Sequence, residues 1–277
     1  MWNIIKAIIL GIVEGITEWL PISSTGHMIL VDEFLHLEVT PEFKAMFFVV
    51  IQLAAVMAVV VLFFNMLFPF NFGKGQQFID KDKFALWFKI LVACIPAAVI
   101  GLLFDDWLNA IFYNFVVVAL ALIIYGILFI DIENAKRMKR PRVDELNKIS
   151  YKDAAIIGLF QVLALIPGTS RSGATIIGSL IIGFSRTVAA EFSFFLAIPV
   201  MAGASLLKVL KFDFHFSGGE LAVLAVGCLV AFVVSIIAVR FLMAYVKKHD
   251  FRLFGIYRIV LGSVVILYFG LKFFEVI

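Results

Sequence analysis

The hydrophobic pattern divides the chain into long apolar runs separated by short polar segments. A spanning helix needs about 20 consecutive apolar residues, and six runs are long enough. These runs are 43–65, 86–104, 115–133, 187–210, 221–243 and 254–274. The pattern therefore predicts an all-α integral membrane protein with six transmembrane helices.

Two other apolar stretches, 3–35 and 153–184, are interrupted by polar centres that contain glycine and proline, at residues 21–26 and 167–173. An apolar arm of about 16 residues is only about 24 Å long as a helix, shorter than a hydrocarbon core of about 30 Å. Irregular backbone at that depth is tolerated only inside protein or beside a water-filled cavity. Each stretch is therefore predicted to form a re-entrant helix–loop–helix hairpin.

The two predicted hairpins align at a constant offset of 147 residues. The offset pairs several small and polar residues: Gly11 with Gly158, Glu14 with Gln161, Ser23 with Ser170, Thr25 with Ser172, and Gly26 with Gly173. Each half of the chain then consists of one hairpin and three spans, at 1–133 and 153–277, joined by a connector at 134–152. Three crossings reverse the direction of entry, so the pattern predicts an inverted repeat with its site at mid-membrane, where the broken helices meet.

Basic residues predict the orientation of this arrangement. The connector 134–152 carries seven Lys and Arg residues. The six-span topology places the segments 66–89 and 240–252 and Arg186 on the same side as the connector. These four parts of the chain together hold 16 of the 23 basic residues. The opposite loop 105–114 has none. Because basic loops stay in the cytoplasm, the connector is expected inside and both termini outside. Asp105, Asp106 and the connector are expected to be solvated.

Composition excludes several classes of protein. Of 277 residues, 63% are apolar and only 16% are charged, whereas soluble domains average about 45–50% and about 25%. Such a chain cannot cover itself with polar surface as a soluble enzyme, and a net charge of +3 argues against disorder and against nucleic acid as a partner. Cys94 and Cys228 lie in apolar runs, so neither a disulfide framework nor a metal cluster is expected.

Polar residues inside the first hairpin are the first candidates for chemistry, because intramembrane charge is costly. Glu14 and Glu18 share one helix face and precede the loop that holds Ser24 and His27. Two adjacent carboxylates repel each other and favour a divalent cation or a shared proton. The plainer alternative is that both glutamates only hydrogen-bond the loop. A histidine beside a serine and two carboxylates favours acid–base or nucleophilic chemistry.

The loop of the second hairpin has the features of an anion site. Arg171 lies among glycines and hydroxyl residues at the expected start of a helix, where free N–H groups and a planar guanidinium both suit phosphate. The alternative is a structural ion pair with Glu14 or Glu18. Ser170, Ser172 and Thr175 either donate to phosphate or only cap the helix.

The two motifs together, EGITEWLPISSTGH at 14–27 and PGTSRSGAT at 167–175, resemble those of the undecaprenyl-pyrophosphate phosphatases, also called bacitracin-resistance proteins. The resemblance covers almost the whole chain in span count and motif order. It implies a hydrolase that converts undecaprenyl pyrophosphate to undecaprenyl phosphate and inorganic phosphate, which recycles the lipid carrier of peptidoglycan and other envelope polymers. Bacitracin sequesters this lipid, so activity would confer resistance.

The resemblance also implies a location, a cofactor and a set of site residues. The location is the bacterial inner membrane, with the active site facing the outer, periplasmic side, and the cofactor is Mg²⁺ or Ca²⁺ held by Glu14 and Glu18. The implied catalytic residues are Glu14, Glu18, Ser24, His27 and Arg171. Nine further residues of the two loops are assigned to substrate binding: Ser23, Thr25, Gly26, Gly168, Thr169, Ser170, Ser172, Gly173 and Thr175.

Several alternatives stay open at this point. Ser24 is the preferred candidate nucleophile, with Glu18 or His27 as base, and direct attack by His27 or by water is the open alternative. Membrane lipids surround the chain, and the oligomeric state, including a homodimer, is undetermined. A transporter that binds a lipid phosphate without hydrolysis would use the same inverted repeat. A lipid-binding scaffold and a dual role in hydrolysis and lipid flipping are the remaining alternatives.

Overall fold

A computed structural model describes residues 2–72, 78–136, 140–210, 212, 216 and 218–273 of the chain. Within these residues the secondary structure is α-helical, with two short 3-10 turns and two isolated β-bridges but no β-strand. Three basic residues used to predict orientation, Lys74, Arg137 and Lys139, lie outside the described residues, as do the side chains of Asp105, Asp106 and Lys136.

Six helices among the described residues are long and apolar enough to cross a membrane, which confirms the six predicted spans. They are α3 (Pro41–Leu62), α5 (Lys81–Phe112), α6 (Phe115–Lys136), α9 (Arg186–Leu210), α10 (Gly218–Val246) and α11 (Arg252–Phe273). Local sequence explains where they begin. At α3, for example, the Thr40 hydroxyl accepts from the N–H of Phe43, and Pro41 occupies the first helical position. The chain is therefore a multi-pass membrane protein.

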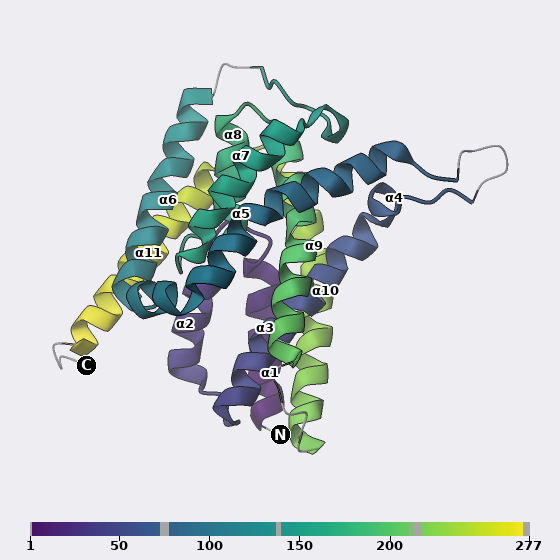
Figure 1. Ribbon diagram of the computed structural model, residues 1–277. Coiled ribbons are helices and arrows are strands. Elements are labelled where there is room, and N and C mark those ends of the chain that lie inside the picture. Colours follow the sequence, from purple (N-terminus) through teal and green to yellow (C-terminus); the bar gives the residue numbers. More distant parts are fainter. Residues whose placement is uncertain are drawn as a thin grey trace.

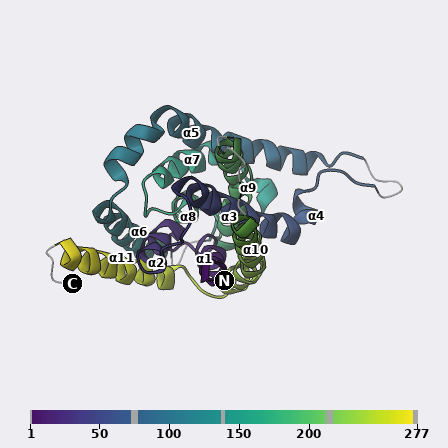
Figure 2. The same cartoon turned by 90° about the horizontal axis from the view of Figure 1, so that it is seen from below.

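Helix α5 differs from the prediction at its C-terminal end. The loop expected at 105–114 is mostly helix, because α5 continues to Phe112 before Asn114 accepts from the N–H of Val117 and starts α6. The aspartates suggested a loop, but the apolar residues around them continue the helical pattern. Figure 2 shows α5 curving around the helix α7 (Tyr151–Val162), and Pro96, which lacks an N–H group, lies inside the curved helix.

Each hairpin is a pair of short helices around an irregular loop. The first consists of α1 (Trp2–Thr17) and α2 (Ser24–Leu35), and the second of α7, the 3-10 turn Leu163–Leu165 and α8 (Arg171–Ile181). The longest of these helices has 16 residues, about 24 Å, so none can cross a bilayer alone. The hairpins extend from opposite ends of the molecule and their loops meet between them (Figure 1). Their re-entry into a membrane stays a prediction.

Helix contacts follow the pattern that two related halves would produce. Helix α1 packs on α10 as α7 packs on α5, α3 packs on α10 as α9 packs on α5, and the equivalent pairs α3–α9 and α6–α11 pack on each other. Glycines at the matched positions allow the first of these contacts. A Cβ at Gly11 would lie 2.8 Å from the Gly227 carbonyl of α10, and one at Gly158 would lie 2.6 Å from the Ala93 carbonyl of α5. The boundaries of the repeat stay a prediction.

The connector is more ordered than the solvated segment that was predicted. The N–H groups of Arg142 and Val143 donate to the carbonyl of Gly183, and the N–H of Ser185 donates back to Val143. Val143 and Ile149 are buried, so apolar side chains fold this basic segment onto the helix ends. The short helices α4 (Phe64–Leu67) and Leu146–Lys148 complete the described elements. Helix α1 begins and α11 ends at the lower end of Figure 1, opposite the connector, as six crossings require.

Candidate active site

The loops of the two hairpins share an unusual backbone at matching serines. Ser23 and Ser170 have φ angles of 73° and 71°, a backbone conformation that residues other than glycine rarely adopt. In both loops the serine hydroxyl accepts from the N–H three residues later, Gly26 in one at 3.3 Å and Gly173 in the other at 3.2 Å. These caps offset strain of about 1–3 kcal/mol at each serine. The same backbone turn therefore begins α2 at Ser24 and α8 at Arg171.

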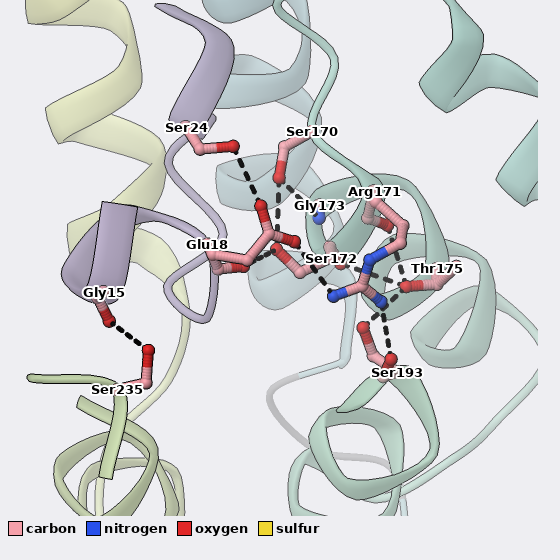
Figure 3. Close-up of polar contacts among 10 residues, drawn as sticks. All are labelled: Gly15, Glu18, Ser24, Ser170, Arg171, Ser172, Gly173, Thr175, Ser193 and Ser235. Atoms are coloured by element: carbon pink, nitrogen blue, oxygen red, sulfur yellow. Dashed lines mark hydrogen bonds and ion pairs between the residues drawn. The ribbon is translucent and has the colours of Figure 1, made fainter. Parts of the chain in front are cut away.

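A row of three side chains joins the two loops through Glu18. The Ser24 hydroxyl donates to Glu18 Oε2 at 2.9 Å, and Arg171 Nη2 lies 3.3 Å from Glu18 Oε1 (Figure 3). The side chains of Glu18 and Arg171 are only 6% and 10% exposed. Glu18 continues the last turn of α1, because its N–H donates to the Glu14 carbonyl at 3.0 Å. A hydroxyl, a carboxylate and a guanidinium thus converge in a site that is largely shielded from solvent.

Arg171 is held in place by groups from α8 and α9. Its Nη1 donates to the Ser193 carbonyl at 2.6 Å, and the Thr175 hydroxyl contacts both the Arg171 carbonyl at 2.9 Å and Ser193 Oγ at 2.8 Å. The Ser172 hydroxyl reaches the Glu18 carbonyl at 3.3 Å and lies 3.1 Å from Ser170 Oγ (Figure 3). Thr175 and Ser172 therefore fix Arg171 and tie α8 to the first hairpin.

The Glu14 carboxylate is buried and has no hydrogen-bond partner in the described part of the chain. Its side chain is 1% exposed, and neither carboxylate oxygen has a hydrogen-bond partner among the described residues. An unpaired buried carboxylate is strongly destabilised unless it binds a proton or a cation. One turn along the same helix face lies Glu18, so the donor set suits a hard divalent cation. No cluster of three His, Cys, Asp or Glu side chains that could hold a metal occurs in the described part of the chain. The substrate or water would therefore have to complete the coordination.

Within the described residues, no hydrogen bond joins the His27 ring to the side chains of the Ser24–Glu18–Arg171 row. Its Nδ1 lies 2.7 Å from the Ser23 carbonyl, and because a carbonyl only accepts, this nitrogen carries a proton. Its Nε2 lies 2.7 Å from the Tyr257 hydroxyl, and the two rings are stacked with their planes 5° apart. His27 therefore stands one helical turn from Ser24 with both ring nitrogens engaged.

Arg258 of α11 is a residue that sequence reasoning missed. It is fully buried, and its two terminal nitrogens donate to the carbonyls of Pro21, Gly168 and Thr169, which belong to both loops. Gly168 has a φ of 91°, and a Cβ there would lie 2.4 Å from the Val118 carbonyl, so only glycine fits. A lone arginine inside the apolar run 254–274 was the available signal. Ser193 and Tyr257 were also missed, and nothing in their local sequence distinguishes them.

The structure thus brings together most of the predicted site residues. Glu18, Ser24, Ser170, Arg171, Ser172, Gly173 and Thr175 form one connected network. The carbonyls of Gly168 and Thr169 instead accept from Arg258, and the Ser23 hydroxyl accepts from the N–H of Gly26 at the start of α2. Glu14 lies one turn before Glu18 and accepts from its N–H, but the Glu14 carboxylate has no hydrogen-bond partner among the described residues. Thr25 lies in the first turn of α2.

A comparison with models of known protein families shows the family of the chain. The family model of the bacitracin resistance protein BacA matches residues 7–264. The chain belongs to the bacitracin resistance protein BacA family. Both hairpin loops, the first five spans and the part of the sixth span that holds Arg258 lie inside the matched region.

Relatives in this BacA family are similar to the chain over nearly their full length. The undecaprenyl-diphosphatase of Desulfitobacterium hafniense is 62% identical over 271 residues, which cover 98% of this chain and 97% of the relative. An undecaprenyl-diphosphatase of Enterococcus faecalis is 61% identical over 96% of each chain. That of Acetivibrio thermocellus is also 61% identical, over 97% of this chain and 98% of the relative.

Proposed function

We propose that this chain is an undecaprenyl-diphosphatase. It hydrolyses undecaprenyl diphosphate with one water molecule to give undecaprenyl phosphate and inorganic phosphate. The observation that carries the proposal is the Ser24–Glu18–Arg171 row, in which a hydroxyl, a proton acceptor and an anion-binding cation meet between the hairpins. The names of relatives that match nearly the whole chain identify the lipid. Recycling this carrier for peptidoglycan synthesis is the basis of bacitracin resistance.

The first step transfers the terminal phosphoryl group to the enzyme. Ser24 Oγ attacks the terminal phosphorus while its proton passes to Glu18, whose Oε2 already accepts that hydrogen bond at 2.9 Å. The bond between this phosphorus and the bridging oxygen breaks, and undecaprenyl phosphate leaves with the bridging oxygen. Arg171 and the N–H groups at the start of α8 stabilise the negative charge on the phosphoryl oxygens.

The second step returns the serine to its free form. Glu18 first passes the proton it took from Ser24 to the departing undecaprenyl phosphate. A water molecule then attacks the phosphorus of phosphoserine, one of its protons passes through Glu18 to Ser24 Oγ as the bond between phosphorus and Oγ breaks, and the other proton leaves with inorganic phosphate. His27 takes part by holding the loop at the Ser23 carbonyl rather than by touching Ser24. Direct attack by His27 or by water replaces this route if Ser24 proves dispensable.

Glu14 and Glu18 are the residues that would hold a divalent cation, Mg²⁺ or Ca²⁺. The cation would neutralise charge on the diphosphate and lower the barrier to displacement. The support is the chemistry of the donors, since the Glu14 carboxylate is buried and lacks a partner among the described residues. Because only two carboxylates are available, affinity for the cation should rise when diphosphate is bound.

The site also suggests where the substrate enters. Tyr257 is stacked on His27 and is 44% exposed on α11, the span that packs beside α6. The prenyl chain would lie along the apolar surface of α11 next to Tyr257, which would place the diphosphate between the loops. We place the protein in the bacterial inner membrane with the site open to the outer side. The support is the basic connector at the end of the molecule opposite both termini.

Phosphate release by pure protein tests the proposed activity. Wild-type protein in detergent with a short-chain prenyl diphosphate should release one phosphate per substrate and leave the prenyl monophosphate, and EDTA should stop the reaction. A transporter or scaffold would bind the lipid and release none. Orientation is tested separately by single cysteines at positions 2, 110 and 140. Labelling of position 140 from outside intact cells would overturn the topology.

A further inference from the structure

The connector and the helix ends around it line a cavity, and no residue of the two hairpin loops belongs to its lining. The connector lies at the upper end of Figure 1, away from the point where the hairpins meet. The cavity has a volume of about 670 Å³ and is formed by the ends of α6, α8 and α10, the start of α9, and the connector. Four of its lining side chains are cationic and one is a carboxylate: Arg140, Arg142, Arg186, Lys247 and Glu133. The proposed reaction uses none of these residues.

Ion pairs and hydrogen bonds hold the walls of this cavity in place. Arg186 binds the buried Glu133 carboxylate through two nitrogens at 2.6–3.1 Å, and the same carboxylate accepts from the N–H of Phe251. Arg142 binds Asp153 and donates to the Ile182 carbonyl at 3.1 Å, while the connector is hydrogen-bonded to Gly183. Two of the four cations are therefore fixed by ion pairs and give the cavity its shape.

The other two cations remain available to a ligand. Neither Arg140 nor Lys247 forms an ion pair or hydrogen bond with the part of the chain that the structure describes, although Glu191 of α9 attracts Lys247 over a longer distance. The start of α9, a 25-residue helix, adds its positive end at Arg186 and Thr187. An anion with several acceptor oxygens is the ligand that such a lining suits.

The position of the cavity indicates the source of that anion. Three of the candidate spans end at its lining: Phe115–Ala135 at Ala135, Arg186–Leu210 at Arg186, and Gly218–Val246 at Val246. Residues at span ends lie at the level of lipid head groups. Leu180, Ile181 and Val246 add apolar surface to the lining, and Ile181 is 52% exposed. Basic pockets between spans at this level suit lipid phosphates.

We propose that this cavity binds the phosphate of an anionic glycerophospholipid, with Arg140 and Lys247 as its main contacts. The fixed Arg142 and Arg186 and the start of α9 complete the receptor. Such a lipid would join α6, α9, α10 and the connector, and so hold together helix ends from both halves of the chain.

The test uses two double variants of the full-length protein that remove the same charge. Arg140→Gln with Lys247→Gln removes the unpaired cations of the cavity. Lys152→Gln with Lys248→Gln removes two exposed cations from the same end of the molecule, outside the lining. Each protein is titrated with phosphatidylglycerol in phosphatidylcholine–detergent micelles, and the rise in thermal unfolding temperature gives an apparent affinity.

The cavity variant should bind phosphatidylglycerol about 30-fold more weakly than wild type, which corresponds to about 1 kcal/mol for each cation. The control variant should change less than about threefold. Arg140→Gln alone, expected to lose about fivefold, replaces the double variant if the latter does not fold. An equal loss in both double variants, or no loss in either, would overturn the proposal.

A second arm separates the lipid from a soluble anion. Inorganic phosphate added to phosphatidylcholine micelles should leave the unfolding temperature of wild type unchanged. A stabilisation by phosphate that the cavity variant loses would assign the cavity to a soluble anion and overturn the lipid assignment. The cavity variant should release phosphate from prenyl diphosphate at the wild-type rate, and because the titration does not need turnover, its result stands whether or not the diphosphatase activity is found.

Discussion

The two hairpins have the same backbone and opposite chemistry. Both loops turn through a serine with positive φ that caps the next helix, and both first helices approach a span through a glycine. After the turn, however, the first hairpin places a hydroxyl and the second a guanidinium, and Glu14 of the first matches Gln161 of the second. The scaffold is repeated while the side chains have become complementary. One hairpin supplies the nucleophile and base, and the other receives the anion.

The largest effect is expected at Ser24, which tests the chemistry assigned to the first hairpin. Ser24→Ala should lower turnover by about 10³-fold or more, because removal of a nucleophile closes the reaction path. Substrate affinity should stay close to that of wild type. Phosphate-release kinetics on a soluble prenyl diphosphate provide the measurement, and Thr25→Ala, a neighbouring hydroxyl outside the network, is the control. Retention of more than about a tenth of turnover, a loss below 1.4 kcal/mol, would transfer the role to His27 or water.

A smaller loss of turnover is expected when Arg171 is replaced; this residue matches Ser24 in the internal repeat. Arg171→Ala should lower turnover by about 10²–10³-fold, by analogy with the removal of other electrostatic donors, and should also raise KM. Arg171→Lys should restore only part of the activity, because a lysine keeps the charge but loses the planar fork. The values of kcat and kcat/KM for the two variants measure how much activity each retains. If the lysine variant restored full activity, charge alone would suffice and the hydrogen bonds of the fork would be unnecessary.

The third prediction contrasts Glu14 with Gln161. Glu14→Gln should raise the cation concentration needed for half-maximal activity at least about tenfold, since even outer-shell partners of a metal contribute about 10–100-fold to affinity. Gln161→Leu removes the hydrogen bond to the Ala93 carbonyl and should lower stability by about 1 kcal/mol without changing the cation midpoint. Mg²⁺ and Ca²⁺ titrations after EDTA treatment separate the two outcomes. Full activity of wild type in EDTA would remove the cation from the mechanism.

The smallest effects should be equal in the two hairpins. Ser23→Ala and Ser170→Ala each remove one helix cap and should each lower the free energy of unfolding by about 1 kcal/mol. Turnover should fall far less than in Ser24→Ala. Unfolding in detergent, followed by circular dichroism, compares the two variants directly. A large loss of turnover in one of them alone would assign that serine to the chemistry rather than to the scaffold.

The sequence predicted the architecture well because bilayer thickness limits the length of every spanning element. It also predicted which two loops meet, since the offset of 147 residues brings Ser23 and Ser170 into equivalent turns. It did not predict the end of α5, where Asp105 and Asp106 resembled a loop although the apolar pattern continued. Nor did it predict Ser193, Tyr257 or Arg258, because their contacts with the loops depend on how α9 and α11 pack. Local spacing contains no information about such packing.

Arg258 has a consequence for how the site is made. It lies on α11, which is synthesised after both hairpins, and it donates to carbonyls of both loops, 237 residues away from Pro21 and 90 from Gly168. Until α11 has been inserted, those carbonyls lack their donor, and the hydrogen bonds that join the two hairpins within the described residues are those between Glu18 and α8. Insertion of α11 therefore acts as a late assembly step of the site. A chain that stops before α11 should insert its earlier spans in the membrane and still lack an ordered catalytic centre.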